Sequence, residues 1–253
     1  MLKEKGILFD ITLCVGCGAC SQACKETNNL KQTNKDFLKD HLSDNTFTVV
    51  EQYGEWFTRK LCMHCNEPAC VSVCLVGAIT KSSTGSVVYD ADKCIGCRYC
   101  MQACPHHIPR YEWATTQPRI RKCNLCNDRI KAGQLTACAE SCPTEATLFG
   151  DKDQLIAIAN KRLKDNPEKY YQHIYGLEEA GGSHVMILSP VPFEQLGYLS
   201  KLPRESMPEF TMRAMEKIPS VVVGGGVFLT GMYWLTKRKN QIAKDEKNNI
   251  KRN

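Results

Sequence analysis

The chain has 253 residues, 16 of them cysteines, and a formal net charge of +6 at pH 7. This length suits one or two domains, and the cysteine count is several times the ordinary usage. The positive charge does not indicate nucleic-acid binding, because it is concentrated at the C-terminus: residues 237–253 hold seven Lys and Arg against two Asp and Glu, and the rest of the chain is nearly neutral.

The N-terminal stretch leads into the first of four cysteine motifs. It has no long apolar core, no cleavage site and no twin arginine, so a signal peptide is not expected. The segment ILFDITLC is predicted to be a short strand that ends in this motif. Residues 25–44 are polar and are expected to form surface helix and loop, and residues 46–62 are strand-like. The first motif has the C-x2-C-x2-C-x3-C spacing of bacterial ferredoxins and consists of Cys14, Cys17, Cys20 and Cys24.

Three further motifs use all the remaining cysteines. The second has the spacing C-x2-C-x4-C-x3-C, the third repeats the first, and the fourth has an eleven-residue gap. Their members are Cys62, Cys65, Cys70 and Cys74; Cys94, Cys97, Cys100 and Cys104; and Cys123, Cys126, Cys138 and Cys142. Between the second and third motifs, Ala78–Thr80 and Ser86–Tyr89 are predicted to pair as a hairpin around a turn at Ser82–Gly85.

Such cysteine patterns have three readings: disulfides, zinc and iron–sulfur clusters. Residues this close in sequence rarely form productive disulfides with each other. Zinc sites usually take two separated pairs of cysteines, whereas these motifs are runs of three plus one. Pro105 and Pro143 also follow the last cysteine of motifs three and four, as in ferredoxins. The pattern therefore favours [4Fe–4S] clusters, in which the fourth cysteine of a run reaches a different cluster.

The predicted fold class is α+β, with two ferredoxin-like two-cluster units, one inserted in the other. The segment ATLFGD, from Ala146, is expected to be a strand that pairs with ILFDIT. Residues 1–57 and 111–150 would form the outer unit with motifs one and four, and residues 58–110 the inner unit with motifs two and three. Units with so little apolar core depend on their metal to fold, so the iron-free chain is expected to be largely unfolded.

The C-terminal third is expected to contain a helix, an arm and a membrane span. Residues 151–175 have a helical apolar pattern, and residues 176–217 are rich in Pro and Gly and are predicted to be an extended arm. Residues 218–236 contain no charge and are long enough to cross a membrane, with Pro219 in the first helical turn. A helix buried in the core is the alternative. The basic tail, residues 237–253, is predicted to be cytoplasmic by the positive-inside rule.

No substrate-converting constellation is evident, so no catalytic residue is predicted. His64 lies inside the second motif, but the cysteines there already complete the ligand pattern. His106 and His107 are interpreted as surface or subunit contacts. Arg119, Arg121 and Lys122 precede the fourth motif and either raise the potential of a nearby cluster or form a solvated basic face.

The four motifs in this order, with CRYC in the third and the eleven-residue gap in the fourth, resemble the electron-transfer (beta) subunits of membrane-bound molybdenum and nickel–iron oxidoreductases. The nearest are those of the formate dehydrogenase-N and hydrogenase-2 type. The segment YGLEEAGGSHVMILSPVPFEQLG and the C-terminal helix are similar too. The chain departs from the pattern at Lys25 and Leu75, where proline is absent after the last cysteine of motifs one and two.

The resemblance implies ligand sets, which spacing alone does not. It implies four [4Fe–4S] clusters, because no motif cysteine is replaced. The sets are Cys14, Cys17, Cys20 and Cys142; Cys123, Cys126, Cys138 and Cys24; Cys62, Cys65, Cys70 and Cys104; and Cys94, Cys97, Cys100 and Cys74.

The resemblance also implies an electron relay. Electrons would pass between a large catalytic subunit containing molybdenum, tungsten or nickel–iron and a membrane haem or quinone subunit. The chain would be anchored in the cytoplasmic membrane with its cluster part in the periplasm. Two alternatives remain open: a stand-alone membrane polyferredoxin and a structural zinc-binding module.

Overall fold

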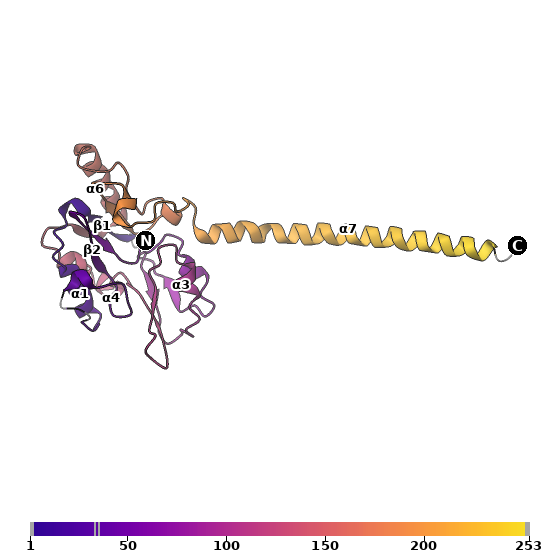
Figure 1. The fold of residues 1–253 in the computed structure, drawn as a ribbon, viewed down its shortest axis with the longest axis horizontal. Coiled ribbons are helices and arrows are strands. Elements are labelled where there is room, and N and C mark those ends of the chain that lie inside the picture. Colours follow the sequence, from indigo (N-terminus) through magenta and orange to yellow (C-terminus); the bar gives the residue numbers. More distant parts are fainter. Residues whose placement is uncertain (1–2, 33, 35, 251–253) are drawn as a thin grey trace. The chain divides into compact units, whose positions relative to one another are not determined.

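The computed structural model describes residues 3–32, 34 and 36–250. It forms two compact units, which divide between Pro208 and Glu209. The first unit holds all the cysteines, and the second is the greater part of one long helix (Figure 1). Each unit is described by itself below.

A three-stranded sheet unites distant parts of the first unit. Its central strand is β1 (Lys5–Asp10), which pairs antiparallel with β8 (Thr147–Asp151) and parallel with β9 (Val185–Leu188). Ile7 of β1 lies opposite Phe149 on one side and Val185 on the other. The predicted pairing of ILFDIT with ATLFGD is confirmed.

Three two-stranded hairpins surround the cysteine motifs. They are β2 (Val49–Tyr53) with β3 (Trp56–Lys60), β4 (Ile79–Lys81) with β5 (Val87–Tyr89), and β6 (Arg110–Tyr111) with β7 (Ile120–Arg121). The hairpin predicted between motifs two and three is confirmed as β4–β5, with strand ends shifted by about one residue.

Short helices follow the cysteine loops. They are α1 (Ala19–Thr27), α2 (Ala69–Ser72), α3 (Tyr99–Ala103), α4 (Asn127–Lys131) and α5 (Ala137–Glu140). Helix α1 packs against α5, and α2 packs against α3. The helices of motifs one and four are thus neighbours, as are those of motifs two and three.

The apolar core lies on both faces of the sheet. Successive residues of a strand point to opposite faces, so Ile7 and Phe9 join a core that also contains cysteine side chains, whereas Leu8 faces α6 (Lys152–Asp165). From α6, Leu155 and Ala159 are buried against Leu8. The helix predicted over residues 151–175 therefore exists but ends ten residues early, where Asn166 and Pro167 follow.

Residues 176–206 are not an extended arm. Residues Val185–Leu188 are all buried as β9, and Phe193 and Leu196 pack into the main core. Ser206, at the end of this segment, is also buried. The many Pro and Gly residues hide any periodicity, but a run of four apolar residues is typical of a strand buried on both faces.

The C-terminal helix α7 (Met207–Ile250) is longer than the predicted span. It begins eleven residues before Ile218, so Pro219 lies inside the helix rather than in its first turn. Its apolar part has a mean hydropathy of 1.5 and suits a membrane span by length and composition. Residues 210–245 are exposed, so the alternative of a helix buried in this chain's own core is wrong. Of the basic tail, residues 251–253 lie outside the described part of the chain.

Candidate functional site: four cysteine loops

The four C-x2-C loops share one backbone feature. The residue before the second cysteine has a left-handed conformation in every loop, with φ of +67° at Gly16, +50° at His64, +70° at Gly96 and +57° at Leu125. Glycine adopts this conformation freely, whereas a residue with a Cβ is strained there. Motifs two and four accept that strain, which indicates that all four loops must have this bend.

The bend turns a backbone N–H toward the first cysteine of the loop. The N–H of Gly96 donates to Cys94 Sγ at 3.4 Å, and that of Leu125 to Cys123 Sγ at 3.3 Å. A bond of the same kind from Gly16 acts to lower the pKa of Cys14, although burial leaves that pKa raised overall. Such N–H groups stabilise negative charge on sulfur.

The third cysteine of each motif is the second residue of a helix. These residues are Cys20 in α1, Cys70 in α2, Cys100 in α3 and Cys138 in α5. The fourth cysteine of each motif follows four residues later, about one helical turn further along.

All sixteen cysteines are free of disulfides. Cysteines of different motifs lie close enough to influence one another's pKa, as Cys142 does for Cys14 and Cys104 for Cys65. We use the name thiol groups for the four ligand sets that the resemblance implies. Thiol group 1 is Cys14, Cys17, Cys20 and Cys142; thiol group 2 is Cys24, Cys123, Cys126 and Cys138; thiol group 3 is Cys62, Cys65, Cys70 and Cys104; and thiol group 4 is Cys74, Cys94, Cys97 and Cys100.

Burial dominates the electrostatics of these thiols. Burial and nearby thiols raise the pKa of Cys20 to about 11 and that of Cys24 to about 12. The pKa of Cys65 is also raised, first by burial and then by Cys62. Without a positive partner such thiols stay protonated at neutral pH, so a metal must displace their protons.

The donor set fits thiolate-bound iron. Each thiol group offers four sulfurs, and backbone N–H groups point at sulfur in several of the loops. Among the residues that the structure describes, no three His, Cys, Asp or Glu side chains are placed to hold a single metal ion. Ligand sets of three cysteines from one motif and one from another suit an iron–sulfur cluster.

Three lysine and arginine side chains of the described residues are buried: Lys25 pairs with Asp40, whereas Lys122 and Arg59 lie near cysteines of the thiol groups. Lys122, which the sequence singled out, is 5% exposed; its ammonium donates to the carbonyl of Val87 and lies near Cys70 and Cys104. Arg59 is 1% exposed and lies near Cys20 and Cys138. Sequence analysis missed Arg59, although its position between Phe57 and Leu61 in the strand pattern places it on an inward face.

The other basic candidates lie outside this environment. Arg121 is partly exposed and forms an ion pair with Glu112, at 2.5 Å. Arg119 is more exposed, and its guanidinium lies 3.9 Å from the carboxylate of Asp92. These two arginines fit the solvated-face interpretation.

The three histidines singled out in the sequence differ in burial and in the groups they contact. His64 is fully buried, and its Nδ1 accepts a hydrogen bond from the N–H of Val87 at 2.9 Å. His107 is exposed. His106 lies edge-on to Tyr175 and lines a cavity of about 220 Å³. Burial lowers the pKa of His106 to about 4.

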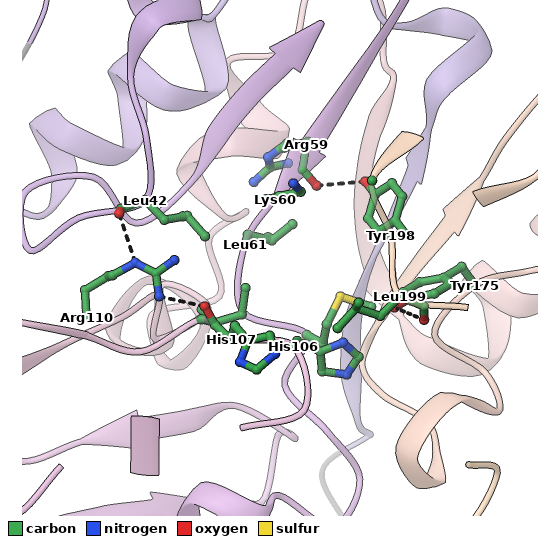
Figure 2. A pocket seen from close by; sticks show the side chains of 13 residues that line it. Leu42, Arg59, Lys60, Leu61, His106, His107, Arg110, Tyr175, Tyr198 and Leu199 are labelled. Atoms are coloured by element: carbon green, nitrogen blue, oxygen red, sulfur yellow. Dashed lines mark hydrogen bonds between the residues drawn. The ribbon is translucent and has the colours of Figure 1, made fainter. Parts of the chain in front are cut away.

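Figure 2 shows this cavity beside the second and third motifs. The carbonyl of Arg59 contributes to its wall and accepts a hydrogen bond from the hydroxyl of Tyr198, at 3.0 Å. Arg110 donates from Nε to the carbonyl of Leu42 at 2.9 Å. The described lining contains no Asp or Glu side chain.

Comparisons with known proteins agree on the cofactor class. Residues 54–152 match a 4Fe-4S dicluster domain, and residues 14–27 match a 4Fe-4S binding domain. A protein of Nitratidesulfovibrio vulgaris is 42% identical over 255 residues, which covers 95% of this chain and 69% of the relative.

The names of two further relatives refer to a hydrogenase and to a formate dehydrogenase. The hydrogenase-2 operon protein HybA of Escherichia coli O157:H7 is 38% identical over 234 residues, covering 76% of this chain and 71% of the relative. The iron–sulfur subunit of the nitrate-inducible formate dehydrogenase of Escherichia coli K12 is 38% identical over 199 residues, covering 72% and 67%.

Proposed function

The chain belongs to the family of 4Fe–4S iron–sulfur subunits of hydrogenases and formate dehydrogenases, and on that basis we propose that it relays electrons through four [4Fe–4S] clusters between a catalytic subunit and a membrane partner. When bound, such clusters each take up and release one electron. The protein provides the ligands, the spacing and the electrostatic environment. The family alone does not distinguish the substrate of the partner, formate or hydrogen.

Each thiol group would hold one cluster. Within each set, cysteines from the two contributing motifs influence one another's pKa, and this proximity supports the assignment. In every group, three cysteines come from one motif and the fourth from another. The packing of α1 on α5 and of α2 on α3 supports two nested two-cluster units.

The order of the relay is the observation that carries the proposal. Thiol groups 1 and 2 approach each other through Cys20 and Cys138. Groups 2 and 3 approach through Cys123 and Cys62. Groups 3 and 4 approach through Cys70 and Cys100. These neighbours support a continuous series from group 1 to group 4.

The two ends of this series are the most open. Cys17 in group 1 and Cys97 in group 4 are exposed to solvent, whereas the other cysteines are partly or fully buried. Exposed apolar residues stand beside them, Val15 in the first loop and Ile95 in the third. Electrons would therefore enter at one of these loops and leave at the other.

Helix α7 would anchor the subunit. Its apolar part suits a single membrane crossing, and the basic residues behind it favour a cytoplasmic C-terminus. The cluster-binding unit would then lie on the periplasmic side and meet a haem or quinone subunit in the membrane.

The test is purification of the native complex in mild detergent under anaerobic conditions. We expect about sixteen irons per chain, broad absorption near 400 nm, as thiolate-bound iron implies, and a co-purifying large subunit. Molybdenum or tungsten in that subunit would assign a formate dehydrogenase, and nickel a hydrogenase. A chain that purifies alone with its iron would replace the fixed subunit with a free polyferredoxin, and a colourless chain with zinc would overturn the proposal.

A further inference from the structure

Arg59 has an unusual environment for a cation. It lies in β3 with only 1% of its surface exposed. Its Nε donates to the hydroxyl oxygen of Thr48 at 2.9 Å, and its Nη1 donates to that of Thr147 at 3.0 Å. These two threonines come from segments far apart in the sequence, so the guanidinium is held from two sides.

Its hydrogen-bonded oxygens are neutral. Among the ion pairs of the described residues, none joins Arg59 to a carboxylate. A buried charge costs several kcal/mol unless an opposite charge compensates it. Two threonine hydroxyls orient the guanidinium but bring no negative charge, so another group must supply it.

The groups that face Arg59 are cysteines of two thiol groups. Cys20 belongs to group 1, whereas Cys138, the thiol with the largest electrostatic effect on Arg59, and Cys123 belong to group 2. The influence is mutual, because Arg59 acts to lower the pKa of Cys14 in group 1 and of Cys24 in group 2. The guanidinium therefore lies between the two groups.

We infer that Arg59 is the shared counter-charge of the two clusters that thiol groups 1 and 2 would hold, and that it raises the reduction potential of both. This inference rests on the proposed function. Four thiolates make each centre negative, and reduction adds one further negative charge. A fixed cation beside the sulfurs stabilises the reduced form more than the oxidised form, so reduction becomes more favourable.

A shared cation has a second consequence. When one electron passes between the two centres, one is oxidised as the other is reduced, and the charge stays next to Arg59. The arginine remains protonated, so no proton accompanies the electron. Arg59 thus stabilises an added electron on either of the two centres and does not oppose electron transfer from one centre to the other.

Lys122 provides the contrast. Its ammonium lies near Cys70 and Cys104, both in thiol group 3. Arg59 and Lys122 therefore act on different parts of the series, and removal of each charge should change different centres.

The experiment is a redox titration followed by electron paramagnetic resonance on the purified full complex. The variant is Arg59→Gln, which removes the charge and keeps a hydrogen-bond donor. The matched control is Lys60→Gln, the next residue of the strand, whose side chain pairs with Glu51 at 2.7 Å on the other face. Arg59→Lys keeps the charge without the planar fork.

We expect Arg59→Gln to lower the potential of two of the four centres. At a fixed potential, the ratio of reduced to oxidised centre should fall at least tenfold, equal to about 59 mV for a one-electron couple. The shift should be larger in the centre that includes Cys138. Arg59→Lys should shift both less, and Lys60→Gln should leave all four unchanged.

An equal shift in all four centres, or none, would overturn the inference. If Arg59→Gln loses iron, Thr147→Val tests the same point, because it keeps the charge but removes one anchor: both centres should then shift in the same direction by a smaller amount, and unchanged potentials would again overturn it. A wild-type complex without [4Fe–4S] signals would instead refute the proposed function.

Discussion

The ammonium group of Lys25 lies 2.6 Å from the carboxylate of Asp40, and both side chains are buried. Lys25 directly follows Cys24, at the position where Pro105 and Pro143 follow the last cysteines of motifs three and four. Proline would remove a backbone N–H from the helix. With lysine there, α1 continues to Thr27. The pair therefore ties the segment after motif one to the helix that carries two cysteines, where a surface segment was expected.

Lys25→Met should destabilise the first unit by about 3–5 kcal/mol, because it leaves the carboxylate of Asp40 buried without its ammonium partner. Thermal unfolding of the iron-loaded complex, followed by loss of absorption near 400 nm, measures this. The double variant Lys25→Met/Asp40→Leu should recover most of the loss. A double variant less stable than the single one would contradict the interpretation.

Gly16→Ala should impair the first cysteine loop. Gly16 has φ of +67°, and an added Cβ would lie 2.4 Å from the ring of Phe57. Gly54→Ala is the control, because Gly54 has φ of +60° with nothing within 4 Å of the added Cβ. The control should cost only about 1–2 kcal/mol for the left-handed backbone. Iron per chain should fall in Gly16→Ala and stay normal in Gly54→Ala; equal iron in both would show that the clash is relieved.

Stability should fall as the pH drops through about 6.5, in part because of His184. Burial, with smaller contributions from Lys152 and Lys81, lowers the pKa of His184, although its bond to the His64 carbonyl and the nearby Glu4 act in the opposite direction. The unfolded chain therefore binds a proton at a higher pH than the folded chain, and the contribution present above that pH is lost below it. In His184→Asn, which keeps a donor near the position of Nδ1, the thermal midpoint should depend less on pH between 5 and 7. An unchanged slope would exclude His184 as the cause.

Removal of iron should unfold much of the first unit. Cys14, Cys20 and Cys142 pack against the main core, and many thiols are buried with raised pKa values, so the metal-free centres leave polar groups in apolar surroundings. Circular dichroism after anaerobic chelation should show loss of tertiary structure. The helix α7, which lies outside this unit, should keep its helical signal in detergent. A chelated protein with its near-ultraviolet spectrum intact would show that the core folds without iron.

Deletion of residues 218–253 should release the complex from membranes and reduce quinone-linked activity, while activity with a soluble dye remains. The reason is that the deleted part of α7 contains the apolar segment and no cysteine. Membrane fractionation and paired quinone and dye assays measure the effect. As a control, the shorter deletion of residues 240–253 should keep the complex on the membrane. Full quinone activity in the longer deletion would defeat the proposed membrane relay.

Some local features were predictable because they depend on residues close in sequence. These are the strand before motif one, the hairpin between motifs two and three and the apolar C-terminal helix, and the structure has all three. The hydrogen bonds from loop N–H groups to the sulfurs of Cys94 and Cys123 are local in the same sense, because donor and acceptor are two residues apart.

Other features depend on residues far apart and left no signal in the spacing. Strand β9 lies beside β1 although about 180 residues separate them. A pattern of residues close in sequence could not reveal this pairing. In the same way, Lys25 is polar and was expected at the surface, but its partner, Asp40, comes from a different loop.

The amino-acid sequence by itself determined the cofactor class and the family, because sixteen cysteines in four ordered motifs leave few other chemistries. Only the tertiary structure decided that Arg59 is buried near cysteines of motifs one and four, and that α1 packs on α5 and α2 on α3. The physical reason is that a motif specifies its own loop, whereas a thiol group takes its fourth sulfur, and its buried cation, from segments that meet only when the sheet and helices pack.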